Sequence, residues 1–233
     1  MNFDPLSLEK NLQCVRERIC QAATRVGRDP REVTLVAVSK GQSAEKIHHL
    51  YLLGVRDFAE NRIAEAFEKM KQLPSDIRWH FIGKLQKNKI PKVLGRFALI
   101  HSVDTPELAQ KISEASHKAR VCTHVLLQAN TSGEKTKGGL NPVEWETHYS
   151  DMLSYQGIVM CGLMTMAPLA GGEDAIRHCF SELRCLRERL QLKGEKLSIL
   201  SMGMSQDFLL AIQEGTTLVR IGAALFGDVH ENK

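Results

Sequence analysis

The chain has 233 residues, of which 43% are hydrophobic and 25% are charged, and its formal net charge is +4. A globular chain of this length buries enough surface to fold without disulfides or metals. Its small positive charge is too weak to indicate a nucleic-acid-binding protein.

The six cysteines form no C-x-x-C pair, and no Cys/His cluster has zinc-like spacing. We therefore interpret them as reduced packing residues and predict no metal site. The N-terminus lacks the pattern of a signal peptide, and no apolar run is long enough to span a membrane. These features predict a cytoplasmic protein with neither a membrane nor a nucleic acid as partner.

The first predicted element is a helix that Asp4 caps and Pro5 begins, with an apolar stripe from Leu8 to Ala23 and an end at Gly27. Short apolar runs follow, most of them rich in Val, Ile and Leu without strict alternation, as in strands buried on both faces. They lie at Val33–Val38, Val55–Ala59, Trp79–Ile82, Leu99–Val103, Cys122–Ala129, Gly157–Met164, Leu197–Leu200 and Leu218–Ile221.

Helical patterns alternate with these runs, and several have a predicted cap or end. The caps and ends are Ser43 and Gly54, Thr105 with Pro106, Asn141 with Pro142, Gly194 after the stripe Ile176–Leu190, and Ser205 with Gly215; the segment around Pro91 is a further helix candidate. The alternation predicts an α/β fold, a single (β/α)8 TIM-type barrel over residues 1–233 with an extra N-terminal helix. An open doubly wound sheet is disfavoured because its G-x-G-x-x-G signature is absent.

In such a barrel the functional groups lie at the carboxyl ends of the strands. Lys40 directly follows the run VTLVAVS, where a lysine is costly unless it is solvated, paired or functional. A surface lysine on a loop is an equally good interpretation from position alone. If Lys40 lies in an apolar barrel mouth near another cation such as Arg220, Schiff-base chemistry becomes feasible.

The segments 198–205 and 219–227 match the phosphate site that many barrels build after their seventh and eighth strands. Ser201 offers a hydroxyl, Gly203 and Gly222 let backbone N–H groups approach an anion, and a helix beginning near Ala223 favours negative charge. In the alternative interpretation, the two glycines only make tight turns.

Three further residues have a functional and a structural interpretation. Arg220 either binds the pyridine nitrogen of pyridoxal 5′-phosphate or forms an ion pair with Asp104 or Glu60. Asn61 either contacts a cofactor or caps the following helix, and capping is the commoner role. Met164, like Met166, either lines a ring-binding wall or packs in the core, which is the commoner case for methionine.

Other polar residues favour structural interpretations. We interpret the basic run Lys84, Lys87, Lys89 and Lys92 as a solvated face. We interpret His80, His101 and His124 as histidines satisfied within the core. The loop 131–139 does not match a P-loop and is expected to be a connecting loop.

Several motifs together closely resemble the pyridoxal phosphate homeostasis protein family, and the match runs in order from about residue 33 to 228. The motifs are AVSK (37–40), FAEN (58–61), WHFIGKLQKNK (79–89), HSVD (101–104), LLQANTSGEKTKGG (126–139), GLMTMAP (162–168), LSMGMSQD (200–207) and VRIGAALFG (219–227). The resemblance implies a barrel related to the N-terminal domain of alanine racemase.

The resemblance also implies pyridoxal 5′-phosphate as cofactor, held as a Schiff base on Lys40. Ser201 and the backbone around Gly222 and Ala223 would hold the phosphate, Arg220 would meet the pyridine nitrogen, and Asn61 would lie near the ring. It implies a role in vitamin B6 balance without catalytic turnover, hence no catalytic residues, with free amino acids and pyridoxal phosphate-dependent apoenzymes as further partners. The chain departs from the family at Gly41-Gln42-Ser43, at Arg62 and at Ala223, where a threonine hydroxyl is common.

Two other functions stay open from the sequence. An amino-acid racemase needs a second base opposite Lys40, often a tyrosine, and we expect Tyr51, Tyr149 and Tyr155 to lie in helices away from the strand ends. A Schiff-base aldolase uses a barrel lysine without a cofactor.

Overall fold

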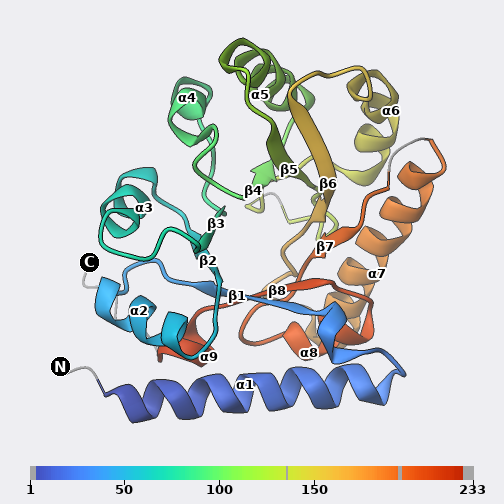
Figure 1. Ribbon diagram of the computed structural model, residues 1–233. Helices are drawn as coiled ribbons and strands as arrows, with labels where there is room; N and C mark the ends of the chain where they lie inside the picture. The colour runs from blue at the N-terminus through green and yellow to red at the C-terminus, as the bar shows by residue number, and fades with distance from the viewer. Residues whose placement is uncertain (1–3, 135, 194–195, 228–233) are drawn as a thin grey trace.

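The structure is a computed structural model that describes residues 4–134, 136–193 and 196–227, and its strands close into one parallel barrel in sequence order (Figure 1). The strands are β1 (Thr34–Val38), β2 (Asp57–Glu60), β3 (Arg78–Phe81), β4 (Leu99–Val103), β5 (Thr123–Gln128), β6 (Ile158–Met164), β7 (Ile199–Ser201) and β8 (Leu218–Ile221). Because β8 pairs with β1, the predicted TIM-type barrel is confirmed and the open sheet is excluded.

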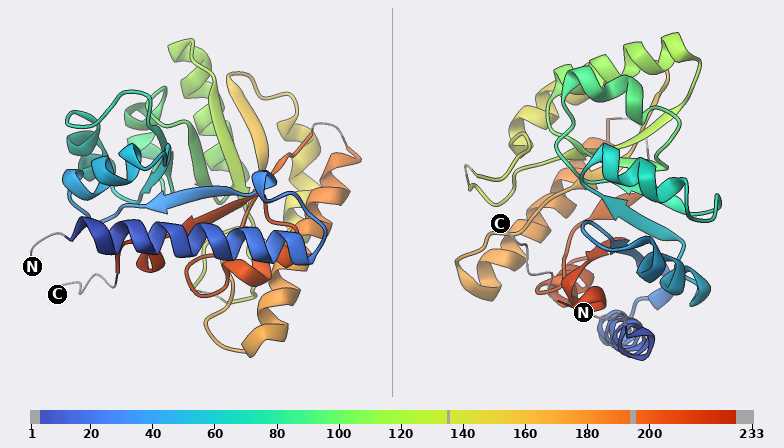
Figure 2. Two further views of the ribbon diagram at one scale, coloured as in Figure 1. Left: turned by 60° about the horizontal axis from the view of Figure 1, so that its bottom comes forward. Right: turned by 90° about the vertical axis from the view of Figure 1, so that its left-hand side faces the viewer.

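Helices follow the strands and surround the barrel (Figure 2). They are α1 (Pro5–Arg25), α2 (Ala44–Leu52), α3 (Ile63–Met70), α4 (Ile90–Val93), α5 (Pro106–Ala119), α6 (Pro142–Met152), α7 (Gly172–Gln191), α8 (Phe208–Gln213) and α9 (Ala223–Phe226), with short 3-10 turns at η1 (Pro30–Glu32) and η2 (Lys87–Lys89). None of the helices in these ranges is long and apolar enough to cross a membrane.

All eight predicted strands are present, with small shifts at their ends. The largest shifts, two residues at the start, are in β2 and β7, and β2 begins at Asp57 because pairing with β3 starts there, opposite Arg78. Val55 is buried although it lies before the strand, so its apolar side chain indicated burial and not membership of β2.

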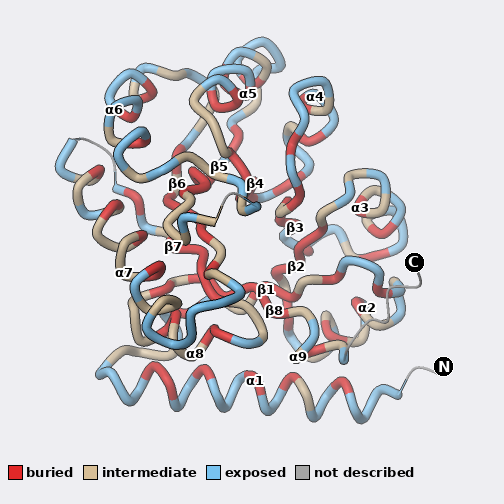
Figure 3. The backbone as a smooth tube through the Cα atoms, turned by 180° about the vertical axis from the view of Figure 1, so that it is seen from behind, coloured by how far each residue is buried: buried red, intermediate tan, exposed pale blue. Residues whose placement is uncertain are grey.

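The extra N-terminal helix α1 is confirmed, and the Asp4 carboxylate caps it by accepting from the Leu6 N–H at 3.1 Å. Its apolar stripe faces α2, α8 and α9, so buried and exposed positions lie on opposite sides of the helix (Figure 3). Each buried leucine, valine or isoleucine of this stripe contributes roughly 1.5–3 kcal/mol before entropy costs.

Three predicted caps are confirmed, because the side chains of Ser43, Thr105 and Asn141 accept from backbone N–H groups of α2, α5 and α6. The cap predicted at Ser205 is wrong, since Asp207 precedes α8 and the Ser205 hydroxyl bonds elsewhere. The helix end predicted at Gly194 lies outside the described residues, and the segment around Pro91 forms only the short α4.

The apolar interior has two parts. The larger cluster lies between the barrel and its helices, and a smaller one fills the inside of the barrel. The inner cluster consists of Val36, Ala59, Leu99, Leu126, Met164 and Leu218. Polar side chains share this interior, and they lead to the candidate site.

Candidate functional site at the barrel mouth

Lys40 follows the carboxyl end of β1, as predicted, and its side chain is exposed. It forms no hydrogen bond or ion pair with the described part of the chain. An unpaired amine on the first strand end of a barrel is therefore available to a ligand.

The residues on either side of Lys40 are held by a buried network that the sequence did not reveal. The Lys69 ammonium donates to the Ser39 carbonyl oxygen at 2.7 Å and to Glu60 Oε1 at 2.7 Å. It also donates to Glu65 Oε1 at 2.6 Å, and the same oxygen accepts from the Gly41 N–H at 2.7 Å. The backbone before and after Lys40 is thus fixed from β2 and α3.

The network depends on charges in the interior. Lys69 is 6% exposed and Glu60 is fully buried. Burial raises the pKa of Glu60, and the hydrogen bond from the Lys69 ammonium partly offsets this rise. Although burial raises the pKa of Glu65, hydrogen bonds from Lys69 and Gly41 lower it below its ordinary value. The sequence signal for this network was the position of Lys69, four residues after Glu65 on the same helix. Lys69 lies with Ala66 on the buried face of α3.

Arg220 lies inside the barrel mouth and is 5% exposed. Its Nη1 donates to the carbonyl and hydroxyl oxygens of Ser201 at 2.8 and 2.6 Å, and its Nη2 donates to the Thr165 carbonyl at 2.9 Å. Nε has no acceptor in the described ranges. The ion pair considered with Asp104 or Glu60 is wrong, because all three hydrogen bonds go to neutral groups on β7 and after β6. Burial lowers the pKa of Arg220 to about 10.

The Ser201 hydroxyl does not face a phosphate loop. It is fully buried, accepts from Arg220 and lies 3.0 Å from His101 Nδ1. We expected this hydroxyl to contact a phosphate, and that expectation is corrected because side chains within the barrel already surround the hydroxyl.

Ser205, and not Ser201, lies beside the predicted anion site at the start of α9. Its hydroxyl accepts from the Ala224 N–H at 3.1 Å, in the first turn of α9. The N–H groups of Gly222 and Ala223 have no acceptor among the described residues, and Ala223 is exposed. One hydroxyl and two unused N–H groups thus gather after β7 and β8, the arrangement that anions prefer.

The two predicted glycines differ in role. Gly203 is buried with φ of +93°, and a Cβ there would come within 2.6 Å of Ala211, so it makes a tight turn. A Cβ on Gly222 would lie 3.5 Å from Val38, an ordinary contact, so space does not require a glycine. The same contact places Gly222 beside the end of β1, two residues before Lys40.

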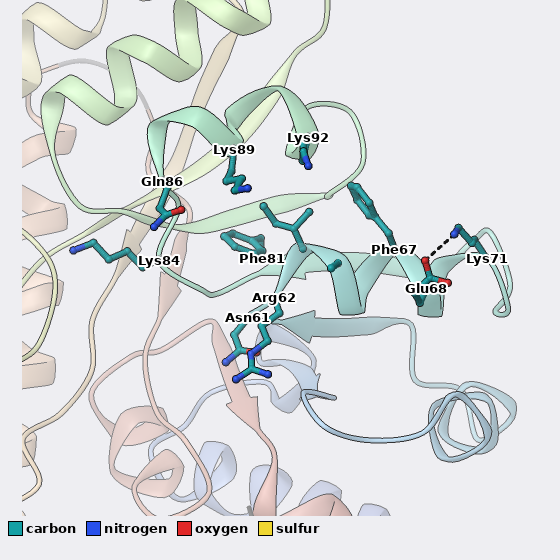
Figure 4. Close-up of a pocket in the computed structure, with 12 residues that line it drawn as sticks. Asn61, Arg62, Phe67, Glu68, Lys71, Phe81, Lys84, Gln86, Lys89 and Lys92 are labelled. Carbon is teal, nitrogen blue, oxygen red and sulfur yellow. Dashed lines mark hydrogen bonds and ion pairs between the residues drawn. The ribbon is translucent and has the colours of Figure 1, made fainter. Parts of the chain in front are cut away.

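Asn61 does not cap α3, which has no side-chain cap. It borders a pocket of about 560 Å³ between α3 and α4, beside the mouth (Figure 4). Lys84, Lys89 and Lys92 of the basic run also line this pocket, whereas Lys40 and Arg220 do not. The pocket therefore adjoins the predicted site without containing its central residues.

The remaining candidates have core or surface positions. Met164 is 2% exposed and packs in the inner barrel cluster. His80 and His101 are buried and hydrogen-bonded, as expected, but the interpretation of His124 is wrong because its side chain is exposed on β5.

The chain is similar to known proteins over nearly its whole length. A family model described as the alanine racemase N-terminal domain matches residues 8–230. The pyridoxal phosphate homeostasis protein of Aquifex aeolicus is 39% identical over 94% of this chain and 97% of the relative. The protein of that name from Pseudomonas aeruginosa is 40% identical over 95% of each chain.

Solved structures agree with this likeness. PipY of Synechococcus elongatus is 35% identical, and its structure with pyridoxal phosphate bound covers 91% of this chain and 100% of PipY with a TM-score of 0.78. Without the cofactor, the TM-score is 0.82. An alanine racemase of Clostridium difficile shares the fold at 19% identity, with a TM-score of 0.76 over 97% of this chain and 58% of that enzyme.

Proposed function

The chain belongs to the pyridoxal phosphate homeostasis proteins, within the alanine racemase N-terminal domain family, and on that premise we propose that Lys40 holds pyridoxal 5′-phosphate as a Schiff base. Pyridoxal phosphate is the cofactor of this family, and the PipY structure contains it. We further propose that this chain carries the cofactor and supports vitamin B6 balance without catalytic turnover.

One observation carries the assignment to Lys40. Its exposed amine has no partner in the described ranges, while hydrogen bonds to Ser39 and Gly41 hold the backbone on both sides. A flexible, unpaired lysine on a fixed backbone suits covalent capture of an aldehyde. When bound, the cofactor supplies that aldehyde and an electron-withdrawing ring.

The other residues fit the remaining parts of the cofactor. Ser205 with the N–H groups of Gly222 and Ala223 would hold the phosphate. The unused Nε of Arg220 would donate to the pyridine nitrogen, with Asn61 near the ring and Met164 beneath it. Ala223 lacks the hydroxyl common in the family, so the Ser205 hydroxyl is the nearby side-chain contact that we assign to the phosphate.

We expect pyridoxal to bind at least about 100-fold more weakly than pyridoxal phosphate, because it leaves the phosphate groups of the site unpaired. The measurement is a spectral titration of the purified chain with each ligand. Ser205→Ala should weaken binding of the phosphate form about tenfold and leave pyridoxal binding unchanged. Similar dissociation constants for the two ligands would contradict the site.

The positions of the three tyrosines support a carrier over a racemase. The Tyr51 hydroxyl donates to Asp76 in the loop before β3, at the amino ends of the strands. Tyr149 is buried in α6, but Tyr155 lies three residues after the end of that helix at Met152, so the expectation that Tyr155 lies in a helix is wrong. None stands at the carboxyl ends of the strands, where a second base would face Lys40. Family membership likewise disfavours a cofactor-free aldolase.

We expect no alanine racemization above the rate of free pyridoxal phosphate. Deuterium wash-in at the α-carbon, followed by chiral analysis, measures it. Exchange with free amino acids should still release the exposed Lys40 and let the cofactor pass to recipient apoenzymes, detected as a spectral shift. Sustained inversion that Lys40→Ala abolishes would favour the racemase. The cytoplasmic location stays a prediction.

A further inference from the structure

A continuous line of buried polar side chains crosses the barrel interior. At one end, Asp57 Oδ1 lies 3.1 Å from His80 Nε2, near the amino ends of the strands. His80 Nδ1 then lies 2.9 Å from His101 Nε2, and His101 Nδ1 lies 3.0 Å from the Ser201 hydroxyl. Arg220 Nη1 completes the line at 2.6 Å from the same hydroxyl.

The ends of this line have fixed roles, because the Arg220 guanidinium only donates and the Asp57 carboxylate only accepts. Ser201 therefore accepts from Arg220, and in one arrangement of the protons it uses its own proton toward His101 Nδ1. His101 must then carry its proton on Nε2 and donate it to His80, and His80 in turn donates from its Nε2 to Asp57. In that arrangement both imidazoles carry their proton on Nε2, and each hydrogen bond in the line is satisfied.

The end of the line at Asp57 carries a negative charge. Although burial raises the pKa of Asp57, hydrogen bonds from His80 and Arg78 hold it below its ordinary value. Burial and the neighbouring His80 and Arg220 hold the pKa of His101 well below its ordinary range, which keeps it neutral. The line therefore has a carboxylate at one end and a guanidinium at the other.

We propose that His80 and His101 are positioning residues that connect Asp57 to Ser201 and thereby hold the Arg220 guanidinium against the pyridine nitrogen of the cofactor. Arg220 itself hydrogen-bonds only to neutral oxygens in the described ranges, so the line adds the distant charge of Asp57 to the nearby charge of the buried Asp207. The inference rests on the proposed function in one respect, that pyridoxal phosphate lies at Arg220.

A local structural role predicts a different result. If the histidines only fill the barrel, their loss affects stability and leaves the cofactor unchanged. If they position Arg220, a change at Asp57 alters the affinity and the ring signal of the cofactor at the other end of the line. Asp57→Asn keeps the shape of the side chain and removes its charge, and His101→Leu breaks the line in the middle.

The test measures two properties of these variants. We expect each to bind pyridoxal phosphate about tenfold more weakly, which corresponds to about 1.4 kcal/mol. We also expect the nitrogen-15 NMR signal of the labelled pyridine ring to shift from its wild-type position, with the Schiff base still on Lys40. Asp76→Asn is the matched control, because Asp76 is an exposed carboxylate that binds Tyr51 and Arg56 and is not part of the line.

Imidazole nitrogen-15 NMR of the chain without cofactor tests the line independently. We expect His101 to be neutral at pH 7 with both ring nitrogens hydrogen-bonded, and a His101 that is charged or lacks either hydrogen bond would overturn the proposal whether or not the cofactor binds. Wild-type affinity and ring signal in both variants would also overturn it while leaving the proposed function intact. If His101→Leu fails to fold, Asp57→Asn decides.

Discussion

Replacing Lys40 by alanine is expected to abolish both the visible absorption of bound pyridoxal phosphate and its trapping by borohydride. The Schiff base requires this amine, whereas the fold does not, because the side chain is exposed and unpaired within the described ranges. The free energy of unfolding should therefore change by no more than about 0.5 kcal/mol. Absorbance, peptide mass mapping after reduction and urea unfolding measure the three effects.

Lys84→Ala is the control for this experiment. Lys84 is also an exposed lysine that follows a strand of the same barrel, but it lines the adjoining pocket. Its loss should leave the absorbance unchanged. An adduct that maps to Lys84, Lys87 or Lys137 alone in the wild-type chain would show that the site is elsewhere.

The barrel could be predicted from the sequence because its signals are local. Parallel strands buried on both faces appear as short apolar runs, and serine, threonine and asparagine mark several helix starts by bonding the backbone a few residues ahead. Such signals locate strands well but not their first residue, as β2 shows. Pairing with a neighbouring strand, which the local pattern does not contain, decides that residue.

The site was less predictable because its contacts join distant segments. Ser201 and Ser205 both lie in the predicted phosphate segment, and only the structure shows that the first faces Arg220 and the second faces Ala224. We sought the charge that balances Arg220 at Asp104 and Glu60, whereas the nearby charge is the buried Asp207 carboxylate and the line of hydrogen bonds from Arg220 ends at Asp57. The motif AVSK identified Lys40, but the residue that fixes its backbone lies on α3.

That residue, Lys69, connects the interior charges to the cofactor lysine. Its ammonium is the single cation that both Glu60 and Glu65 contact in the described ranges. One oxygen of Glu60, Oε2, is buried with no hydrogen-bond partner there. Within the described ranges, removal of Lys69 therefore leaves the buried Glu60 carboxylate with no cation and only the Ser39 hydroxyl as a donor, and it frees the carbonyl of Ser39.

We expect Lys69→Met to destabilise the fold by about 3–5 kcal/mol at pH 7, because methionine keeps the volume but leaves the Glu60 charge unpaired. Lys71→Met, directly after the same helix, is the matched control, since the ion pair of Lys71 with Glu68 is exposed and worth at most about 1 kcal/mol. Loss of Lys69 raises the pKa of Glu60 further above its unfolded value, so a protonated Glu60 relieves the penalty. The difference in unfolding free energy between variant and wild type should then shrink as the pH falls toward about 4–5.

Urea unfolding at several pH values measures this difference in stability. Pyridoxal phosphate binding should weaken in parallel, because the backbone around Lys40 is no longer held. A variant as stable as Lys71→Met would contradict the role given to this network.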